Sequence, residues 1–282
     1  MFELRFENSD GKLVNLNDGK NYVVTEYEGF DPPSASLYTS KSPNRKGSKK
    51  NGSTLNERAL IIQVKILGDI EVNRNALYEW TDAETELKIY YKNGVKNVYC
   101  VGTVTDCDAP TFTNNEIMTV AITCPDPYLK DLQEIATEIS SLLKQFVFPF
   151  AIDAAGIPFS TMRENNNTNV FNAGAETGAI IRIKALGEVS NIRLYDANDA
   201  TRIFSINMTL QANEIVEIDT ERSPRTVKLI RTNGAVENIL RYVGHKPTWF
   251  LLKKGNNVFG FTASDVGNVE VTFSFTNKYL GA

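Results

Sequence analysis

The stretch "LKIYYKNGVKNVYCVG" (87–102) indicates the kind of fold this chain adopts. Two strand-like runs flank Asn93-Gly94, and Asn followed by Gly accepts the positive φ that a tight primed turn requires. The pattern therefore predicts a β-hairpin. The same arrangement recurs at Asp10-Gly11 and Asn233-Gly234. Three such turns, far apart in the chain, predict a mainly β protein built from short antiparallel strands.

Further alternating or apolar runs predict more strands along the chain. They lie at 60–67, 118–123, 179–186, 191–196, 202–210, 214–219 and 269–275. Many short strands separated by turns favour sandwiches or open barrels over a parallel βαβ sheet. A chain of 282 residues is long enough for two domains of this kind.

Two segments read as helices. In "CPDPYLKDLQ" (124–133) the prolines end a strand, Asp126 is a good N-cap and Pro127 suits the first helical position. Apolar residues then recur at helical spacing, which predicts an amphipathic helix over 129–147 that connects a domain at 1–128 to a domain at 148–282. A second, shorter helix is predicted at 73–86, "NRNALYEWTDAETE".

Residues 31–56 combine three prolines, many serines and five basic side chains. The basic residues are Lys41, Arg45, Lys46, Lys49 and Lys50. We predict a long loop here, and a loop of this length is either functional or disordered. A basic loop could meet a polyanion or an acidic protein surface, although the composition favours a merely solvated loop. A second polar, glycine-bearing loop is predicted at 162–178.

Composition excludes several classes of function. The net charge of −4 and the pI near 5.3 argue against wrapping nucleic acid or coating an anionic membrane. The N-terminus lacks the apolar region of a signal peptide, and no apolar run is long enough to span a bilayer. Three cysteines form an odd, sparse set that suggests a reduced cytoplasmic origin. A single histidine makes His/Cys metal sites unexpected, and no cofactor is predicted.

The sequence contains few candidate catalytic residues. No phosphate loop, nucleophile elbow or zinc motif is present, and His245 reads as a solvated turn residue. Cys107 lies between Asp106 and Asp108, whose charge would raise its thiol pKa. The acidic residues near the centre could bind calcium or act as paired carboxylates, but turn and cap roles fit better. They are Asp106, Asp108, Glu116 and Asp126. We predict that the chain is not an enzyme.

Several motifs together are similar to one known family. In the first half, "GSTLNERALIIQVKILGDIEVNRNALYEW" (52–80) has Arg58 opening an alternating strand and Arg74 shortly before "LY". "CPDPYL" supplies Asp126, Pro127 and Tyr128. In the second half the matching stretches are "FVFPF" (146–150), 169–194, 215–220 and 249–282, and their most specific positions are Gly174, Gly255, Asn256, Tyr279 and Gly281.

By these motifs the chain resembles the distal tail protein (Dit) family of siphophages, over nearly its whole length. The resemblance implies a β-rich, ring-forming belt domain at 1–128 and a galectin-like β-sandwich at 148–282. It implies a structural virion protein of the tail tip, assembled in the host cytoplasm as a hexameric ring. The ring would join the tail tube protein to the tail-tip or tail-associated protein, and its outer domains would carry receptor-binding or baseplate proteins.

The resemblance also suggests site residues. Ring closure requires one patch to meet a different patch on the next copy, so the basic loop residues, Arg58 and Arg74 are interface candidates. Residues 31–56 would become ordered only in the ring, or would line its lumen or its tube-facing side. Gly255 and Gly281 would serve tight turns, and Asn256 would hold its loop through side-chain hydrogen bonds.

Two alternatives remain open. The first is a carbohydrate-binding module for host-surface attachment, with exposed candidates at Arg182, Arg193, Tyr195 and Trp249. In "TWFLLKKGNNVFGF", Trp249 and the three phenylalanines could stack on a sugar, although aromatics at strand spacing usually belong to a core. The second alternative is a tail-associated hydrolase, which the missing catalytic groups disfavour.

Overall fold

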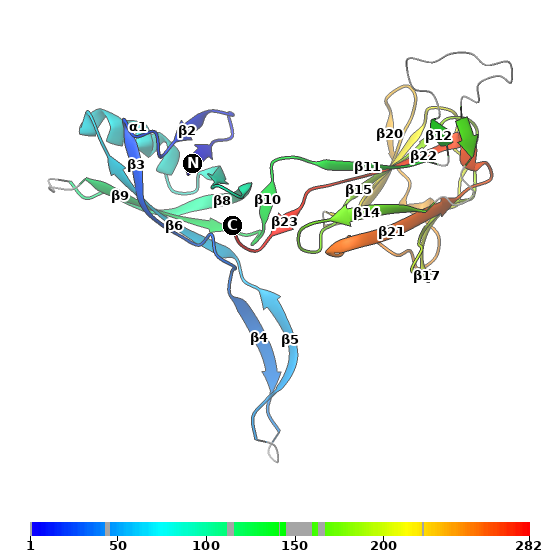
Figure 1. Cartoon of the computed structure of the whole chain (residues 1–282), viewed down its shortest axis with the longest axis horizontal. Coiled ribbons are helices and arrows are strands. Elements are labelled where there is room, and N and C mark those ends of the chain that lie inside the picture. The colour runs from blue at the N-terminus through cyan, green and yellow to red at the C-terminus, as the bar shows by residue number, and fades with distance from the viewer. Residues whose placement is uncertain are drawn as a thin grey trace. The chain divides into compact units, whose positions relative to one another are not determined.

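The computed structural model describes residues 2–42, 46–111, 116–140, 142–144, 160–162, 167–221 and 223–282. The chain forms two compact units, each described here by itself. Unit 1 consists of Met1–Leu132 together with Lys278–Ala282, and unit 2 of Gln133–Asn277. Both units are built from antiparallel strands, so the predicted mainly β fold is confirmed (Figure 1). Among the described residues, no helix combines the length and apolar composition that crossing a bilayer requires.

Unit 1 is organised around a nine-stranded sheet in the order β2-β1-β7-β8-β9-β6-β3, which β10 and β23 extend. Its strands are β1 (Glu3–Glu7), β2 (Leu13–Asn15), β3 (Tyr22–Glu28), β6 (Arg58–Ile66), β7 (Glu86–Lys92), β8 (Asn97–Asp108), β9 (Ile117–Cys124), β10 (Leu129–Asp131) and β23 (Lys278–Tyr279). The Asp10-Gly11 and Asn93-Gly94 hairpins join β1 to β2 and β7 to β8, as predicted. Burial alternates along β6 to β9, so one face of each strand supplies the core.

The sheet of unit 1 curls so that its two ends meet. The ring of Phe2, just before β1, stacks on Tyr27 of β3 with centroids 5.1 Å apart. Asn17, which follows β2, receives a hydrogen bond from the Val24 backbone N–H and donates one to the Phe2 carbonyl. These contacts bring β3 beside the β1–β2 end and enclose the core.

Helix α1 (Ile70–Thr81) connects β6 to β7 and packs against the sheet through the buried Leu77. Asp69 caps its first turn by accepting a hydrogen bond from the Val72 N–H. The helix predicted at 73–86 exists, but it begins earlier and ends at Thr81. It ends there because Asp82 leaves the helical conformation, with a φ of −58° and a ψ of 137°, and Glu84, with a φ of +71°, then turns the chain into β7.

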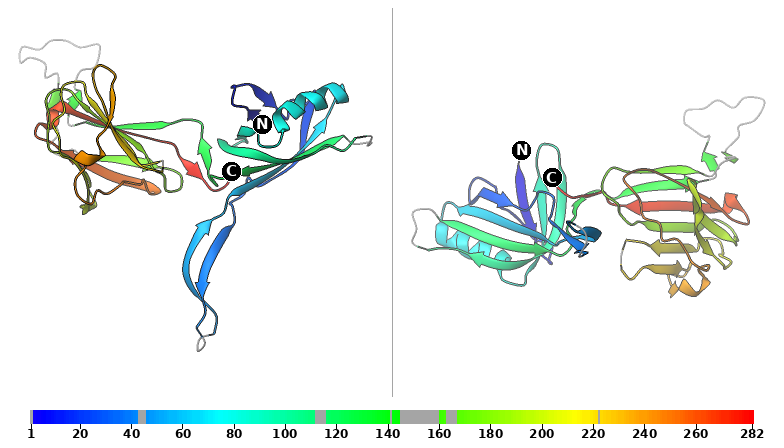
Figure 2. Two further views of the ribbon diagram at one scale, coloured as in Figure 1. Left: turned by 180° about the vertical axis from the view of Figure 1, so that it is seen from behind. Right: turned by 90° about the horizontal axis from the view of Figure 1, so that it is seen from below.

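A two-stranded hairpin leaves unit 1 between β3 and β6, formed by β4 (Ala35–Ser40) and β5 (Lys49–Leu55). It projects away from the body of the unit (Figures 1 and 2). The prediction of a long loop at 31–56 is therefore wrong for these two strands. The sequence concealed them because serine, lysine and glycine outnumber the large apolar residues that usually mark a strand.

Unit 2 is a sandwich of two antiparallel sheets around one hydrophobic core. The six-stranded sheet contains β11 (Ile135–Ser140), β22 (Val269–Phe275), β15 (Ile180–Ala185), β18 (Ile215–Asp219), β19 (Thr226–Ile230) and β20 (Val236–Asn238), in that order. The four-stranded sheet contains β14 (Thr168–Asn172), β21 (Gly255–Thr262), β16 (Ile192–Asp196) and β17 (Asp199–Ile206). Both sheets contribute to the core, for example through Phe273 of β22 and Phe259 of β21, whose rings stack at 4.8 Å.

Short elements complete unit 2. They are the strand pair β12 (Leu142–Lys144) and β13 (Ser160–Met162) and the 3-10 helices η1 (Leu240–Tyr242) and η2 (Val266–Asn268). The predicted polar loop at 162–178 contains β14, which the asparagine-rich composition of this segment disguised. The "FVFPF" stretch at 146–150 lies outside the described residues.

The helix predicted at 129–147 is wrong wherever the chain is described, because β10, β11 and β12 occupy its place. Ile135 and Ile139 are four residues apart, a spacing that suits a helix but also every second position of a strand. In the structure Ile135, Thr137 and Ile139 face Phe275, Phe273 and Val271 of β22. The apolar strand β22 needs a partner on this side, and β-branched residues supply it. The chain passes from unit 1 to unit 2 after Leu132, not at 128, and returns at Lys278.

Candidate assembly site

Arg58, the first residue of β6, is the centre of a joint in unit 1. It is 1% exposed, and all its hydrogen-bond partners are backbone carbonyls. Nε and one terminal nitrogen donate to the Pro127 carbonyl at 2.9 and 2.7 Å. The other donors reach Asp31 at 2.9 Å, Leu280 at 2.7 Å, and Gly29. One side chain therefore ties together the base of the β4–β5 hairpin, the end of the "CPDP" turn and the C-terminal segment.

The Arg58 joint holds its charge without a carboxylate partner. Burial lowers the pKa of the guanidinium, but arginine remains protonated in proteins, so the charge is balanced by carbonyl dipoles. Five N–H groups in a planar fork match five hydrogen bonds to four carbonyls. Lysine, with three donors, could not satisfy the same set.

Glycine at position 29 lets the chain pass close to this joint. Gly29 has a φ of +91°, and a Cβ atom there would lie 2.0 Å from the Ala59 carbonyl oxygen. Gly281 also sits close to this region, since a Cβ on it would lie 3.0 Å from Pro32. The predicted tight turn at Gly281 is thus a close packing contact, at an ordinary negative φ.

Two further motif residues, Asp126 and Tyr279, shape the chain in the same part of unit 1. Asp126 accepts a hydrogen bond from the Tyr128 N–H and pairs with Lys130 at 2.8 Å, so it shapes a turn and does not cap a helix. The Tyr279 hydroxyl donates to Asp131 at 2.9 Å as β23 pairs with β10. The chain thus leaves and re-enters unit 1 along two paired strands.

Arg74 also acts inside unit 1. This α1 side chain is 4% exposed and pairs with Glu71 at 2.8 Å and with Glu116, just before β9. It therefore fixes the helix to the sheet. The prediction that Arg58 and Arg74 are interface residues does not fit the structure, because both guanidinium groups are buried and bonded within the unit.

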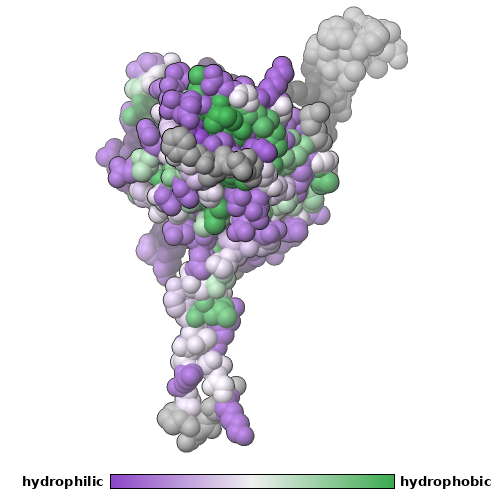
Figure 3. Space-filling model, turned by 90° about the vertical axis from the view of Figure 1, so that its left-hand side faces the viewer, coloured by the Kyte–Doolittle hydropathy of each residue, from purple (hydrophilic) through white to green (hydrophobic). Residues whose placement is uncertain are grey.

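The β4–β5 hairpin carries the other interface candidates. Leu37, Tyr38 and Leu55 are 61%, 56% and 37% exposed. Because Ala35 pairs with Leu55 and Leu37 with Ser53, both leucines lie on one face of the hairpin. Figure 3 shows hydrophobic surface part-way along the hairpin and hydrophilic surface toward its tip. The described lysines Lys41, Lys46, Lys49 and Lys50 are exposed there, while Arg45 lies outside the described residues.

Two buried asparagines shape the loops of unit 2, and neither was predicted. Asn257 accepts a hydrogen bond from the Lys253 N–H and donates to the carbonyls of Lys253 and Gly255. Asn172 accepts from the Gly174 N–H at 2.9 Å and donates to two further carbonyls. The predicted loop role of Asn256 is therefore performed by its neighbour, and Asn256 is exposed and pairs with Asn169. Gly255 does adopt the left-handed turn expected of it, with a φ of +94°.

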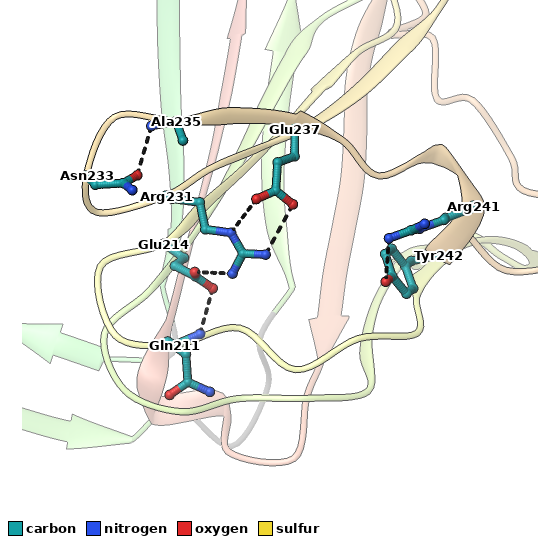
Figure 4. Close-up of polar contacts among 8 residues, drawn as sticks. All are labelled: Gln211, Glu214, Arg231, Asn233, Ala235, Glu237, Arg241 and Tyr242. Carbon is teal, nitrogen blue, oxygen red and sulfur yellow. Dashed lines mark hydrogen bonds and ion pairs between the residues drawn. The ribbon is translucent and has the colours of Figure 1, made fainter.

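Arg231 forms a different kind of clamp at one end of the sandwich (Figure 4). Its guanidinium binds Glu237 through two hydrogen bonds of 2.8 and 3.1 Å and Glu214 through one of 2.8 Å. Hydrogen bonds to both carboxylates raise the pKa of Arg231, and the pKa of Glu237 is lowered by the same contact. Glu214 also accepts from the Gln211 N–H, so the clamp joins the turn before β18 to the β19–β20 hairpin.

Two of the cysteine thiols considered as nucleophiles have raised pKa values. The Cys100 pKa is raised well above its ordinary value by a hydrogen bond with Cys124 and by burial. Burial also raises the pKa of Cys107, and the charges of Asp106 and Asp108 add to the effect. Within the described ranges, no three acidic, histidine or cysteine side chains gather closely enough to hold a metal ion. His245 is exposed.

The sugar-binding candidates do not share one face. Arg182 lies on β15 of the six-stranded sheet and pairs with Glu217 at 3.0 Å, whereas Arg193 and Tyr195 lie on β16 of the four-stranded sheet. Trp249 is half-buried and contacts Phe204 edge-to-face at 5.3 Å. The three phenylalanines near it, Phe250, Phe259 and Phe261, are buried in the core.

Two family models match the chain, one in its first half and one in its second half. Residues 9–124 match the phage tail protein RIFT-related domain, and residues 172–279 match the siphovirus-type tail component, C-terminal domain. No curated protein matches the chain.

Solved structures resemble it over nearly the full length. The Dit protein of phage SPP1, described as a paradigm of the hub adsorption apparatus in phages that infect Gram-positive bacteria, is 15% identical. The match covers 99% of each chain with a TM-score of 0.70. A chain of the phage P2 baseplate, in its calcium-activated conformation, is 10% identical over 97% of this chain and 98% of that one, with a TM-score of 0.49. At 15% identity, the likeness to the SPP1 protein is one of fold.

Proposed function

This chain belongs to the distal tail protein family of siphophages, and on that premise we propose that it closes into a hexameric ring at the distal end of the tail tube. It is a structural protein of the phage tail and a component of the virion. In the proposed arrangement unit 1 forms the ring and joins the tube protein to the tail-tip protein. Unit 2 offers the attachment surface for receptor-binding proteins, and assembly takes place in the host cytoplasm.

The observation that carries the ring proposal is the exposed β4–β5 hairpin. An isolated two-stranded hairpin is marginally stable in water, because it has no core face to bury. Here Leu37 and Leu55 lie on one face of it and are 61% and 37% exposed. Seating this face on a second copy would remove apolar surface from water, at about 25 cal/mol for each Å² buried.

Charge favours a neighbouring copy as the hairpin's partner. The segment from Pro33 to Asn56 contains five basic and no acidic residues, although the whole chain has a net charge of −4. The rest of the chain is correspondingly more acidic, so the hairpin of one copy is attracted to the body of the next. Such a contact joins two different patches, and repetition by rotation closes a ring.

The Arg58 joint supports this use of the hairpin. It binds the carbonyls of Gly29 and Asp31, in the segment that joins β3 to β4, and Arg58 itself is the first residue of β6, shortly after β5. Both ends of the hairpin are therefore anchored at one rigid point. A fixed base reduces the conformational freedom that the hairpin would lose when it docks.

Ring formation can be tested by light scattering coupled to size exclusion, with negative-stain microscopy, on the intact chain. We expect the wild type to form particles of about six times the 31.4 kDa chain mass. The double variant Leu37→Asp/Leu55→Asp should remain monomeric, because carboxylates would replace the apolar contacts. Val95→Asp is the matched control, since Val95 is 89% exposed at the β7–β8 turn of the same unit.

A hairpin variant that forms rings as readily as Val95→Asp would refute the hairpin contact. Trypsin supplies an independent readout, because it cleaves after the exposed lysines Lys49 and Lys50. Cleavage there should be slower in the ring than in the monomeric variant. Equal rates would count against burial of the hairpin on assembly.

We expect the protein to work without catalysing a reaction. Its family consists of structural tail components. The pKa values of Cys100 and Cys107 are raised, which disfavours the reactive thiolate. The pKa of Cys124 is lowered by its hydrogen bond with Cys100, which is itself a buried thiol.

A further inference from the structure

The outward face of the four-stranded sheet of unit 2 contains a polar depression of about 490 Å³. Asn191, Arg193, Thr262, Ala263 and Ser264 line it, at the point where β16 begins and β21 ends. Arg193 pairs in register with Thr262 on one side and with Ser205 on the other. The depression thus combines one guanidinium with amide and hydroxyl groups, the kind of polar set that orients a small ligand.

The charge of Arg193 is not neutralised within the described part of the chain, where no carboxylate forms an ion pair with it. Two acidic residues close in sequence to this lining are engaged elsewhere. Asp196 pairs with Arg202 at 2.7 Å, and Asp265 accepts hydrogen bonds from the Gly267 N–H and the Asn268 side chain. An exposed, uncompensated guanidinium offers a planar fork that matches phosphate or carboxylate oxygens.

An aromatic residue lies on the same face of the sheet as this arginine. Tyr195 is two residues beyond Arg193 on β16, so both side chains point to the same face of the sheet. The hydroxyl end of the ring lies over Gly260, where an added Cβ would be 2.5 Å from the Tyr195 Cζ and oxygen atoms. The hydroxyl donates to Asn167 at 3.0 Å, which fixes the ring in place. Ile203, 37% exposed, lies opposite Tyr195 on β17 and adds apolar surface next to it.

We propose that this surface binds a saccharide that carries an acidic group. The apolar C–H face of the sugar ring rests on Tyr195 and Ile203, and its phosphate or carboxylate pairs with Arg193. Asn191, Thr262 and Ser264 then hydrogen-bond to sugar hydroxyls. This activity goes beyond ring assembly and does not depend on it, because none of these residues lies in unit 1.

The experiment is calorimetric titration of the intact chain with N-acetylglucosamine-1-phosphate. Separate arms use N-acetylglucosamine and inorganic phosphate. We expect the sugar phosphate to bind at least tenfold more tightly than either part alone, because it meets both the ring and the guanidinium. Arg193→Gln and Tyr195→Ala should each weaken binding at least tenfold. Tyr195→Phe keeps the ring and should retain binding, which separates loss of stacking from misfolding.

Arg182→Gln is the matched control, since Arg182 is an exposed arginine on the other sheet of the same unit. It should leave the affinity unchanged. Equal affinity for phosphate and for the sugar phosphate would overturn the saccharide assignment, and so would the absence of binding at millimolar concentrations. An unchanged affinity in Arg193→Gln would also overturn it. Ring formation by Arg193→Gln, measured in parallel, shows whether the assembly role stands or fails on its own.

Discussion

Arg58 in unit 1 and Arg231 in unit 2 both hold distant segments together, but their surroundings are opposite. Arg58 is 1% exposed and binds only backbone carbonyls, whereas the Arg231 side chain is 38% exposed and binds two carboxylates. The first arrangement costs desolvation of a charge and is tolerated only because every N–H has an acceptor. The second arrangement needs little desolvation, and solvent screens the attraction between its charges.

The difference teaches where geometry matters most in this protein. A carbonyl cannot be moved without moving the main chain, so Arg58 fixes backbone positions at the hairpin base, at Pro127 and at Leu280, all within unit 1. Carboxylate side chains can shift to follow Arg231, so the clamp tolerates small displacements. We therefore expect changes at the Arg58 joint to lower the stability of unit 1 strongly, and changes at the Arg231 clamp to have small effects on unit 2.

The largest effect should come from removing the Arg58 guanidinium. Arg58→Met keeps the stem but leaves buried carbonyls without donors, which should cost about 4 kcal/mol or more of unit 1 stability. The two tryptophans make this measurable, because Trp80 lies in unit 1 and Trp249 in unit 2. In a Trp249→Phe background, urea unfolding followed by Trp80 fluorescence reports on unit 1 alone.

The control for Arg58 is Arg182→Met in the same background, which removes an exposed guanidinium from unit 2. It should leave the Trp80 transition unchanged. Arg58→Lys should fall between the wild type and Arg58→Met, because lysine restores the charge but only three donors. If Arg58→Met unfolds at the same urea concentration as the wild type, the hydrogen bonds of Arg58 do not stabilise unit 1.

Gly29→Ala tests the region of the Arg58 joint without changing a charged residue. The new Cβ would collide with the Ala59 carbonyl, which adjoins Arg58, and would also force alanine to a φ of +91°. Together these should cost about 3 kcal/mol, toward the upper end of the range for backbone strain. Gly11→Ala is the matched control, because Gly11 also has a positive φ (+76°) but no atom within 4 Å of the added Cβ.

We expect Gly11→Ala to cost only about 1 kcal/mol, the strain of the left-handed conformation alone. The Trp80 unfolding transition measures both variants. Equal losses would mean that the close approach at Ala59 contributes nothing, and that the Arg58 joint can relax around an extra methyl group.

Arg74 provides an intermediate case, since its buried guanidinium has both a partly buried and an exposed carboxylate partner. Glu116 has an 18% exposed side chain and Glu71 a 74% exposed one. Glu116→Gln should cost about 2 kcal/mol, because it leaves the buried charge uncompensated on that side. Glu71→Gln should cost less than about 0.5 kcal/mol. Trp80 fluorescence reports both, and the reverse order would show that burial does not decide the strength of these pairs.

The sequence predicted those parts of the molecule that depend on local signals. The Asx-Gly turns and the alternating run at 269–275 gave the correct hairpins and strand, because turn-forming residues and period-two burial are written in a few adjacent residues. The helix at 129–147 failed because the spacing of Ile135 and Ile139 fits both periodicities. Only the distant partner β22 decides between them.

The candidate site was harder to predict, for a related reason. Arg58 stood out as a motif residue, but its partners at 29, 31, 127 and 280 are brought together only by the fold. Asn257 was missed in favour of Asn256, because two adjacent asparagines look alike until one is known to point inward. Arg193 and Tyr195 were identified as exposed candidates. That β16 places them side by side over Gly260 required the register of the sheet.

The smallest effect should be a pH dependence that belongs to the Arg231 clamp and not to the Arg58 joint. Arg231 lowers the pKa of Glu237 below its ordinary value of 4.5, so the folded state binds this proton more weakly than the unfolded chain. The stabilisation is fully present above pH 4.5 and is lost as the pH falls through the lower pKa of the folded state. Because the pair is exposed, the change should be slight and should shrink further in salt.

In a Trp80→Phe background, Trp249 fluorescence can follow unit 2 unfolding between pH 6 and pH 3 in the wild type and in Glu237→Gln. The two curves should converge at low pH, since protonated glutamate and glutamine are then equivalent partners. A difference that persists unchanged to pH 3 would mean that the carboxylate charge is not what holds the β19–β20 hairpin to Arg231.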